Sequence, residues 1–521
     1  MAGQGLTRRR FVAGSAATVA ALATGVRTGH AAVALREERH RAVVIGSGFG
    51  GSITALRLTQ AGVNVVMLER GRRWPAGQPN VFPDPLTNPL DKRLSWRGTV
   101  PLPGAKSSTG LLEYFDGRGM DVIAPACVGG GSVPYHGMSL RPRGDHFARV
   151  MPSALDYETF EQTWYPRAEA MLRVGGMPDD VFASERYRSS RQFAEYVRRA
   201  GLPEVTRVPM TIDWDVVRRE LRGEQKPLIS RGDVGMGVNG PGKHSLDTNY
   251  LPAAEATGRL DLRPLHDVTA IRRDAQGRWI VEVDVLSPTA KVTERLRITT
   301  DALFLGAGTM NTTKLLLRAR DTGAITDLPD DVGRWWGTNG DLIVATTLRD
   351  RTGTWQGGPA NIATLDWDNP EGPVTLLFAA APFKAETHSM LLVGMVIPDG
   401  HGTLTYDAAR NRVKVLWPKS ADAGAMAAGR ARMRQLTRAA GAISTFDTTR
   451  AAPSTFHQLG GAVIGKVCDA HGRVLGQRGL YVTDGALIPG STACANPSLT
   501  IAALAERNAA TVVAGDVGTV F

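Results

Sequence analysis

The chain has 521 residues, of which 43% are apolar and 21% charged, and its formal net charge is +11. This length exceeds the size at which one hydrophobic core keeps growing, so it predicts two domains. The composition favours neither a disordered chain nor a bundle of membrane-spanning helices. The basic residues are scattered singly without interleaved aromatic residues, which favours a solvated surface over a nucleic-acid site.

The first 34 residues have the pattern of a signal peptide. Arg8, Arg9 and Arg10 precede an apolar run at 12–26 and small residues near 31–34. The run is shorter than the ~20 apolar residues that span a bilayer. With its paired arginines, the segment is typical of the twin-arginine (Tat) export machinery and predicts a secreted protein. An amphipathic or disordered N-terminus is the alternative.

The next predicted elements form a strand, turn, helix and strand. Residues 41–46 are a short apolar run typical of a buried strand, and residues 52–62 carry apolar residues at helical spacing. Residues 63–68 then predict a second strand that ends at Glu69. A βαβ unit of this length predicts a parallel sheet.

The rest of the chain alternates between loops, helices and strands. Residues 72–106, rich in Pro, Trp and Arg, predict a long loop and a candidate cover for the substrate site. The predicted elements that follow are a helical region at 157–202, two strands within 260–298 around a turn at 274–277, a strand at 302–308, a helix at 312–320, strands within 333–417, and a helix at 421–441.

Three cysteines, Cys127, Cys468 and Cys494, fit neither a disulfide framework nor a metal-binding template. They are predicted to be small, buried, apolar residues, and no metal site is predicted.

The turn after the first strand satisfies the dinucleotide-binding pattern G-x-G-x-x-G, and its residues are Gly46, Ser47, Gly48, Phe49, Gly50 and Gly51. The first glycine permits the tight turn, the second lets the backbone approach a pyrophosphate, and the third lets the helix pack on the strand. Glu69 lies where a carboxylate can accept from ribose hydroxyls. The pattern predicts dinucleotide binding; the alternative is a purely structural turn.

Two later segments favour FAD over NAD. One is a second flexible turn formed by Gly129, Gly130, Gly131 and Ser132. The other is Asp484, a carboxylate at a strand end within reach of ribityl or pyrophosphate oxygens. The alternative for Asp484 is that it caps a turn.

Asn496 and Pro497 have helix-start chemistry, with Asn as N-cap and Pro at the first helical position. A helix that begins there and points at a flavin would stabilise negative charge on the reduced ring. His457 lies beside paired glycines and suits proton exchange near neutral pH. An ordinary capped helix and a histidine hydrogen-bonded within a turn remain the alternatives.

Together these residues resemble the glucose–methanol–choline (GMC) oxidoreductase family and, within it, the secreted actinobacterial cholesterol oxidases with non-covalent FAD. The similarity includes these segments: 129–132, 243–247, 303–308, 318–323, 402–409, 481–491 and 502–508. It implies an α/β fold with a Rossmann-like FAD-binding domain and a second α+β substrate domain on a mostly antiparallel sheet. The implied FAD-binding segments are 40–80, 240–330 and 470–521, and the implied substrate-domain segments are 81–239 and 331–469.

The resemblance also implies roles for single residues. His457 matches the histidine that binds the substrate hydroxyl, and Asn496 matches the asparagine that contacts the flavin. Glu386 looks like the carboxylate that shuttles a proton during double-bond isomerisation, although by itself it would be interpreted as a surface glutamate. Val268 matches a position whose backbone contacts adenine.

The implied reaction is FAD-dependent oxidation of a sterol 3β-hydroxyl to the ketone, with O2 reduced to H2O2 and isomerisation to the enone. The implied partners are a sterol or other alcohol, O2 and, transiently, a membrane surface from which sterol is extracted. The alternatives are an oxidase or dehydrogenase acting on a non-steroid alcohol, and a secreted flavin- or lipid-binding protein without turnover.

The chain departs from the cholesterol oxidase pattern near the flavin. Tyr135 stands where the relatives have asparagine, and Gln458 stands where they have proline. His136 lies two positions past the histidine used for covalent links in other relatives, so no covalent flavin is predicted. The loop before Asn496 is one residue longer. These differences leave the substrate more open than the chemistry.

Overall fold

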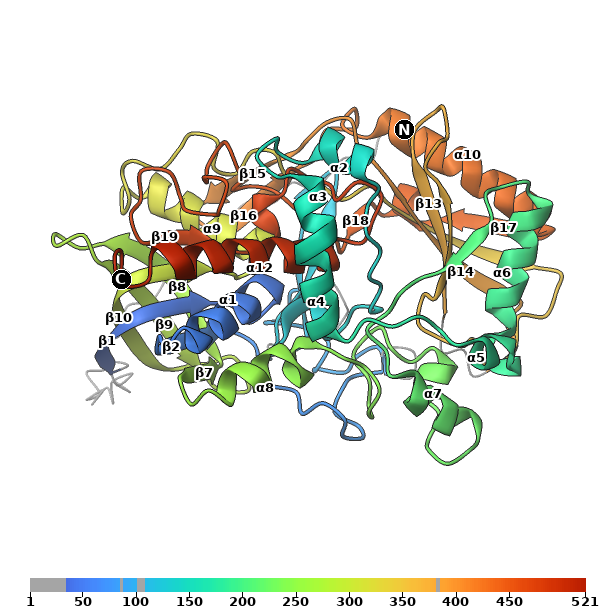
Figure 1. Ribbon diagram of the computed structural model, residues 1–521, viewed down its shortest axis with the longest axis horizontal. Coiled ribbons are helices and arrows are strands. Elements are labelled where there is room, and N and C mark those ends of the chain that lie inside the picture. Colours follow the sequence, from blue (N-terminus) through green and yellow to red (C-terminus); the bar gives the residue numbers. More distant parts are fainter. Residues whose placement is uncertain (1–33, 85–87, 101–107, 381–384) are drawn as a thin grey trace, which may run out of the picture.

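The structure is a computed structural model that describes residues 34–84, 88–100, 108–380 and 385–521. Within these residues, seven strands form the larger mixed sheet (Figure 1). Its order is β7–β2–β1–β10–β9–β8, with β19 also pairing to β10. The strands are β1 (Leu35–Ile45), β2 (Val65–Glu69), β7 (Leu260–Pro264), β8 (His266–Arg273), β9 (Trp279–Leu286), β10 (Val292–Leu305) and β19 (Leu480–Val482).

The predicted βαβ unit is present as β1, α1 (Phe49–Gln60) and β2, and β1 pairs with β2 in parallel. Alternate residues of β1 enter two different cores, with Val43 on one face of the sheet and Val44 on the other. Both faces are therefore covered, which explains why this strand reads as a continuous apolar run. The helix begins at Phe49, three residues earlier than predicted.

One face of this sheet carries α1, α8 (Tyr250–Glu255) and the long C-terminal helix α12 (Pro497–Gly515), and α12 lies beside α1 in Figure 1. Glu506 of α12 is fully buried and accepts bidentate hydrogen bonds from Arg57 of α1. Its Oε1 also accepts from the Tyr250 hydroxyl at 2.8 Å. Because a buried carboxylate is tolerated only when it is paired, this contact specifies how the C-terminal helix packs on the sheet.

The second large sheet is antiparallel, and six of the described strands form it in the order β17–β11–β14–β13–β12–β6. Helices α6 and α10 cover one of its faces (Figure 1). The elements are β6 (Val205–Arg207), β11 (Asp341–Leu348), β12 (Ile362–Asp366), β13 (Val374–Ala379), β14 (Ser389–Val396), β17 (Ala442–Asp447), α6 (Arg188–Arg199) and α10 (Ala423–Ala439).

Two small three-stranded sheets lie among the described residues. One comprises β15 (Thr403–Asp407), β16 (Arg412–Leu416) and β4 (Gly117–Arg118). The other comprises β18 (Ser454–Thr455), β5 (Asp121–Pro125) and β3 (Leu112–Phe115). The other α-helices are α2 (Gly144–Val150), α3 (Tyr157–Thr159), α4 (Tyr165–Leu172), α5 (Asp179–Ala183), α7 (Trp214–Leu221), α9 (Thr309–Asp321) and α11 (Thr448–Ala451). The short helical turns are η1 (Gly130–Ser132), η2 (Phe160–Trp164), η3 (Glu185–Tyr187), η4 (Ile229–Arg231), η5 (Leu246–Thr248) and η6 (Gly485–Leu487).

A mixed sheet with a βαβ unit and a separate antiparallel sheet confirm the predicted fold class. Strands of the first sheet come from 35–69, 260–305 and 480–482, and strands of the second come from 205–207, 341–396 and 442–447. The domain boundaries implied by the resemblance stay a prediction.

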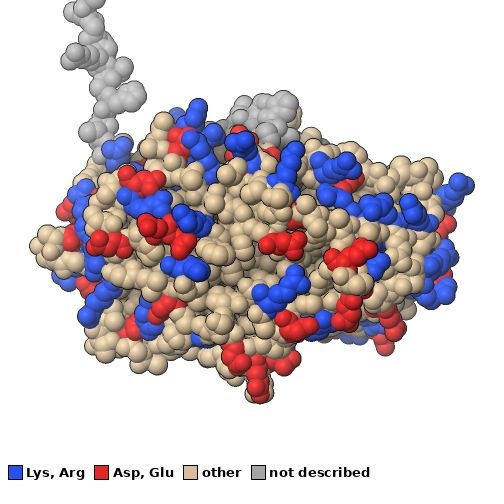
Figure 2. Space-filling view, turned by 90° about the horizontal axis from the view of Figure 1, so that it is seen from above, with Lys and Arg blue, Asp and Glu red and all other residues tan. Residues whose placement is uncertain are grey.

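Several smaller predictions are also answered. The described part of 72–106 holds no helix or strand, and the three cysteines are free and buried. Within the described part of the chain, no helix has the length and apolarity needed to cross a bilayer. On the face drawn in Figure 2, basic and acidic side chains are interspersed, as in a solvated surface. The predicted signal peptide lies outside the described residues, except for Ala34.

Candidate active site

A cavity of about 930 Å³ extends from the carboxyl ends of the parallel strands to the face of the antiparallel sheet that lies opposite α6 and α10. This volume lies at the upper end of the range for ligand-binding cavities. Its walls combine the glycine turn at 46–50, the end of β2, the start of α12 and residues of β11, β13 and β14.

The glycine turn presents bare backbone to this cavity. Gly46 has φ +92°, and a Cβ there would lie 2.3 Å from the Gly306 carbonyl oxygen, so only glycine fits. A Cβ on Gly48 would meet no atom within 4 Å, so the space beside this residue is open to a ligand. Helix α1 begins directly afterwards, and its first N–H groups and dipole favour an anion such as a pyrophosphate.

Gly50 and Gly51 serve packing more than ligand approach. A Cβ on Gly50 would lie 2.0 Å from the Thr483 carbonyl oxygen, and one on Gly51 would lie 2.0 Å from that of Gly46. Phe49 and Gly50 line the cavity, but Gly51 does not. The prediction that Gly51 binds the cofactor is therefore corrected: it lets the helix approach the strand.

Glu69 lines the cavity at the end of β2 and is buried. Its Oε2 accepts from the Ser47 N–H at 3.1 Å and from the Ser47 hydroxyl at 2.7 Å, while Oε1 accepts from the Gly71 N–H at 2.8 Å. Each carboxylate oxygen can accept two hydrogen bonds, so Oε1 retains capacity for a ribose hydroxyl.

The second glycine turn touches the first. A Cβ on Gly130 would lie 2.7 Å from Cα of Gly48, and the Gly129 N–H donates to the Ser47 hydroxyl at 3.2 Å. Gly130 and Gly131 line the cavity, whereas Gly129 does not. The two turns therefore form one continuous backbone cradle.

Ser132 was predicted to bind the cofactor, and the structure corrects this. Its hydroxyl donates to the Gly129 carbonyl at 2.7 Å and accepts from the Leu246 N–H at 2.9 Å. The residue is fully buried and does not line the cavity. Ser132 and Gly129 thus hold the second turn in shape.

Asp484 lines the cavity, but its carboxylate is occupied within the protein. Oδ2 accepts from the Gly308 N–H at 2.8 Å and the Thr312 hydroxyl at 2.5 Å, and Oδ1 accepts from the Ala486 N–H at 2.9 Å. Burial raises the pKa of Asp484 to about 6 in spite of these donors. The turn-capping interpretation therefore describes its side chain, although the residue also lies on the cavity wall.

The predicted helix at Asn496 begins where expected, with Asn496 at the N-cap and Pro497 in the first turn of α12. The Asn496 side chain, however, makes no capping hydrogen bond, and its buried Oδ1 has no protein partner among the described residues. Asn496 and Pro497 both line the cavity. An unpaired buried amide oxygen costs about 1–3 kcal/mol, so it indicates a ligand that supplies the missing donor.

The wall near β8 holds one residue that the resemblance implied, Val268, and others that sequence inspection missed. Val268 lines the cavity, as do Trp96 and Arg97 of the long loop. The Arg70 and Arg97 guanidinium groups lie 5.1 and 5.6 Å from the Trp96 ring centroid, and Arg97 pairs with Asp267 at 3.2 Å. The richness of this loop in Trp and Arg was the available signal, but its partners are distant in sequence.

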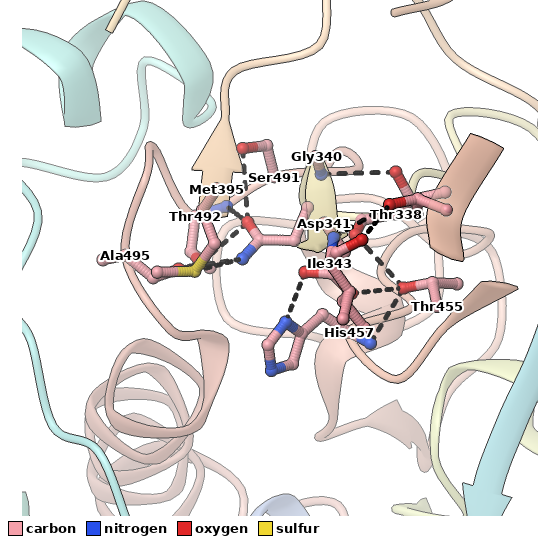
Figure 3. A network of polar contacts seen from close by, with 12 residues as sticks. Thr338, Gly340, Asp341, Ile343, Met395, Thr455, His457, Ser491, Thr492 and Ala495 are labelled. Carbon is pink, nitrogen blue, oxygen red and sulfur yellow. Dashed lines mark hydrogen bonds and ion pairs between the residues drawn. The ribbon is translucent and has the colours of Figure 1, made fainter. Parts of the chain in front are cut away.

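His457 follows β18 and lines the cavity, with its side chain 27% exposed. Its Nδ1 lies 2.6 Å from Oδ1 of Asp341, at the start of β11. The opposite ring nitrogen, Nε2, is turned away from this polar network (Figure 3). Burial opposes protonation of the imidazole, but the Asp341 carboxylate outweighs it and raises the pKa of His457.

Asp341 was not identified from the sequence. Its Oδ2 accepts from the Thr455 hydroxyl at 2.9 Å, and the His457 N–H in turn donates to the Thr455 oxygen at 3.0 Å. The neighbouring Asn339 accepts from the Thr492 N–H and donates to the Ala495 carbonyl, both at 2.8 Å, which holds the loop that precedes Asn496 (Figure 3). One network thus positions both His457 and Asn496.

The antiparallel sheet supplies an apolar wall. Alternate residues of β13, Leu377 and Ala379, line the cavity, while Leu376 and Phe378 pack in the core beneath α10. Ile343 of β11 and Leu391 and Val393 of β14 lie on the same wall, and Met138 of a neighbouring loop also lines the cavity. The strand-like alternation of 391–397 indicated a two-faced strand but not that one face borders a ligand.

Tyr135 and His136, the departures from the family pattern, both line the cavity. The Tyr135 hydroxyl lies 2.6 Å from that of Thr211, and His136 Nδ1 accepts from the Ala360 N–H at 3.3 Å. Burial lowers the pKa of His136 to about 4, so it is neutral at physiological pH. The buried Lys243 ammonium donates to the carbonyls of Val133, Tyr135 and Val234, which anchors this loop.

Glu386 does not line the cavity. Its carboxylate accepts from the N–H groups of Thr352, Gly353 and His388 and joins two loops. Although burial opposes ionisation, these donors prevail and lower the pKa of Glu386 to about 2. The proton-shuttling role that the resemblance implied for Glu386 is therefore corrected, since its carboxylate lies off the cavity wall and its oxygens already accept from backbone N–H groups.

The described residues contain no cluster of three or more His, Cys, Asp or Glu side chains that suits a metal ion. The cavity fits FAD instead: a bare glycine cradle at a helix N-terminus, a carboxylate at the end of β2, and an unpaired amide at the start of α12. The fold and this site define an FAD-linked oxidoreductase of the α/β class.

Comparisons with known proteins match the C-terminal part of the chain to one family. Residues 398–505 match the family described as GMC oxidoreductase, and residues 339–447 match its C-terminal part. These segments contain Asp341, His457 and Asn496. Over residues 339–505 the chain is similar to the GMC oxidoreductase family, and this similarity supports an FAD-linked alcohol oxidoreductase.

Individual proteins that are similar to this chain are named as oxidases. The chain is 27% identical over 537 residues to a cholesterol oxidase of Mycobacterium tuberculosis strain CDC 1551 / Oshkosh, covering 90% of each chain. It is also 27% identical to a cholesterol oxidase of Acinetobacter baumannii, covering 58% of this chain and 54% of the other. A fungal aryl-alcohol oxidase and the pyridoxine 4-oxidase from Mesorbium loti share the fold, with TM-scores of 0.63 and 0.61 at 16% identity. Each alignment covers 91% of this chain and 99% of the solved chain.

Proposed function

We propose that this oxidoreductase converts the 3β-hydroxyl of a sterol to the ketone and passes the electrons to O2, which forms H2O2. The observation that carries the proposal is that His457, Asn496 and an apolar sheet face border one cavity. The apolar wall suits a rigid hydrocarbon skeleton, and the two polar side chains suit its single hydroxyl. The relatives named cholesterol oxidase support the choice of substrate.

Asn496 and His457 have different roles in the proposed reaction. Asn496 lines the cavity, and its amide Nδ2–H can donate to the substrate hydroxyl oxygen, which orients the alcohol and leaves its single proton for His457. His457, when neutral, carries its proton on Nδ1 because that nitrogen faces a carboxylate, so Nε2 is the base that accepts the hydroxyl proton. Bound FAD supplies the two-electron acceptor. Closing this site within an apolar wall excludes water from the reacting hydroxyl.

Isomerisation of the steroid double bond is not assigned to Glu386 in this proposal. The carboxylate lies outside the cavity lining, and its low pKa makes it a poor proton shuttle near neutral pH. A ketone with an unshifted double bond is therefore the expected first product.

The decisive experiment is anaerobic. Purified FAD-loaded protein is mixed with cholesterol, with a 3α-hydroxysteroid and with a primary aromatic alcohol, and bleaching of the flavin band is followed. The proposal expects rapid bleaching only with the 3β-hydroxysteroid, then peroxide and ketone once air is admitted. Bleaching by the aromatic alcohol alone would overturn the sterol assignment.

A non-steroid alcohol is the second candidate substrate. It is favoured by His136, whose neutral imidazole lies on the cavity wall and would suit a more polar molecule than a sterol. The same alcohol panel separates the two substrates, and absence of bleaching with every alcohol would favour a binding protein without turnover.

We also propose export by the twin-arginine route and transient contact with a membrane surface. The first rests on the arginine-led N-terminal pattern, and replacing Arg8, Arg9 and Arg10 with lysine should retain the protein inside the cell. The second is supported by Phe456, which is 51% exposed, lines the cavity and precedes His457. Phe456→Ser should reduce co-sedimentation with sterol-containing vesicles without affecting turnover of a soluble alcohol.

A further inference from the structure

Asp341 is the one charged partner that His457 has among the described residues, and the pair is built with close geometry. The carboxylate Oδ1 lies 2.6 Å from Nδ1, within the short range of charge-assisted hydrogen bonds. Asp341 is 7% exposed, so water competes little for its oxygens. Such burial strengthens the interaction with His457.

The second oxygen of this carboxylate is also bound. Thr455 donates to Oδ2 and receives the His457 N–H, so the threonine links the backbone of the histidine to the carboxylate that holds its ring. Asp341 itself belongs to β11, whose pairing with β14 and β17 holds the strand from both sides. The carboxylate is thus placed by the sheet, and the imidazole is placed by the carboxylate (Figure 3).

We propose that Asp341 is a positioning residue that holds His457 in the tautomer with Nδ1 protonated, directs Nε2 at the substrate hydroxyl, and sets the basicity of that nitrogen. The inference rests on the proposed function, in which His457 takes the hydroxyl proton. Asp341 does not itself exchange the proton; its charge stabilises the imidazolium that forms after transfer. The pairing makes Nε2 a stronger base than an isolated histidine.

The pairing of Asp341 with His457 predicts the direction in which the pH dependence of activity shifts when Asp341 is replaced. Proton acceptance requires neutral His457, so the acidic limb of the kcat/KM profile reports its pKa. Asp341, on β11, is the charged group that raises this pKa; Thr455 on β18 and Asn496 at the start of α12 are uncharged. Replacing Asp341 with asparagine removes the charge but keeps the shape. We expect kcat to fall about 10- to 100-fold, since a charge-assisted hydrogen bond contributes ~1.5–3 kcal/mol, while the acidic limb moves to lower pH.

The experiment compares the FAD-loaded wild type with D341N, D341E and D366N. Asp366→Asn is the matched control, because Asp366 is a carboxylate on β12 of the same sheet that pairs with Arg432 and does not line the cavity. For each protein, the kcat/KM profile is measured with an alcohol that bleaches the flavin, and the His457 pKa is measured by NMR with labelled histidine. The His457 resonance is assigned by its loss in H457Q.

The NMR titration needs no turnover, so it tests the Asp341–His457 pair even if the alcohols fail and the proposed function falls. The proposal expects a lowered His457 pKa in D341N, partial recovery in D341E and no change in D366N. Should D341N fail to fold, D341E and T455V, which removes the donor to Oδ2, still report a change in the same pKa. An unchanged His457 pKa and acidic limb in the folded Asp341 variants would overturn the proposal.

Discussion

Replacing Gly130 with alanine should weaken FAD binding while both large sheets stay folded. Gly130 has φ +51°, and its new Cβ would lie 2.7 Å from Cα of Gly48. Carbon atoms pack best at about 3.5–4.0 Å, so the two glycine turns would have to separate by roughly 0.8 Å. The left-handed backbone conformation adds about 1–2 kcal/mol of strain for alanine. Because a misplacement near 1 Å in a site can cost about 100-fold, we expect the Kd for FAD to rise by about that factor.

Gly62 provides the matched control for the strain alone. It also has a positive φ, +84°, but a Cβ there would meet no atom within 4 Å. G62A should therefore lower Tm slightly and leave FAD affinity unchanged. Deflavinated wild type, G130A and G62A would be titrated with FAD by flavin fluorescence, and each would be melted by circular dichroism. If G130A bound FAD with the wild-type Kd, the two turns would not act as one cradle.

Four further predictions follow from the site. His457→Ala should lower kcat by ~10²–10⁴-fold with FAD still bound, as absorbance of the desalted protein would show; unchanged turnover would remove His457 from the mechanism. Glu386→Gln should cost about 1–2 kcal/mol in urea unfolding, because three N–H groups lose a charged acceptor, and leave the ratio of enone to ketone unchanged. Acid precipitation should release all flavin into the supernatant, since His136 lies two positions past the histidine that other relatives use for a covalent link; flavin retained on the pellet would contradict this. Asp484 has a raised pKa, so its contribution to stability is fully present below pH 4 and is lost as pH rises through about 6. Relative to D484N, the deflavinated wild type should thus lose roughly 3 kcal/mol of unfolding free energy between pH 4 and 7. A difference in stability between the two proteins that did not change with pH would contradict the raised pKa of Asp484.

Local patterns predicted the βαβ unit because its strands and helix are specified by residues close in sequence. The same approach placed the first strand at Arg41, whereas β1 starts at Leu35. Residues Leu35–His40 are mostly exposed and charged, and they become strand by pairing with Arg295–Thr300 of β10. A pairing between segments some 260 residues apart leaves no periodic trace in either one.

Some residues of the candidate site were likewise predictable from the sequence, and others were not. Gly46, Gly48 and the helix start at Asn496 were found from sequence, because a tight turn and a helix cap have local requirements. Glu386 shows the limit of resemblance: its sequence context matched, but its carboxylate is bound by loop N–H groups away from the cavity. Asp341 was missed although the structure pairs it with His457, because nothing in the sequence around an aspartate at the start of a strand indicates its partner.

By itself, then, the sequence determined that this chain has a dinucleotide turn on a parallel sheet, a capped C-terminal helix and a histidine suited to proton exchange. Only the tertiary structure decided that Gly130 rests on Gly48, that Asn496 leaves its amide oxygen unpaired, and that Asp341 holds His457 across 116 positions of sequence. The physical reason is that turns and caps depend on backbone conformation within a few residues. Orientation and basicity of a catalytic side chain depend instead on groups that only folding brings together.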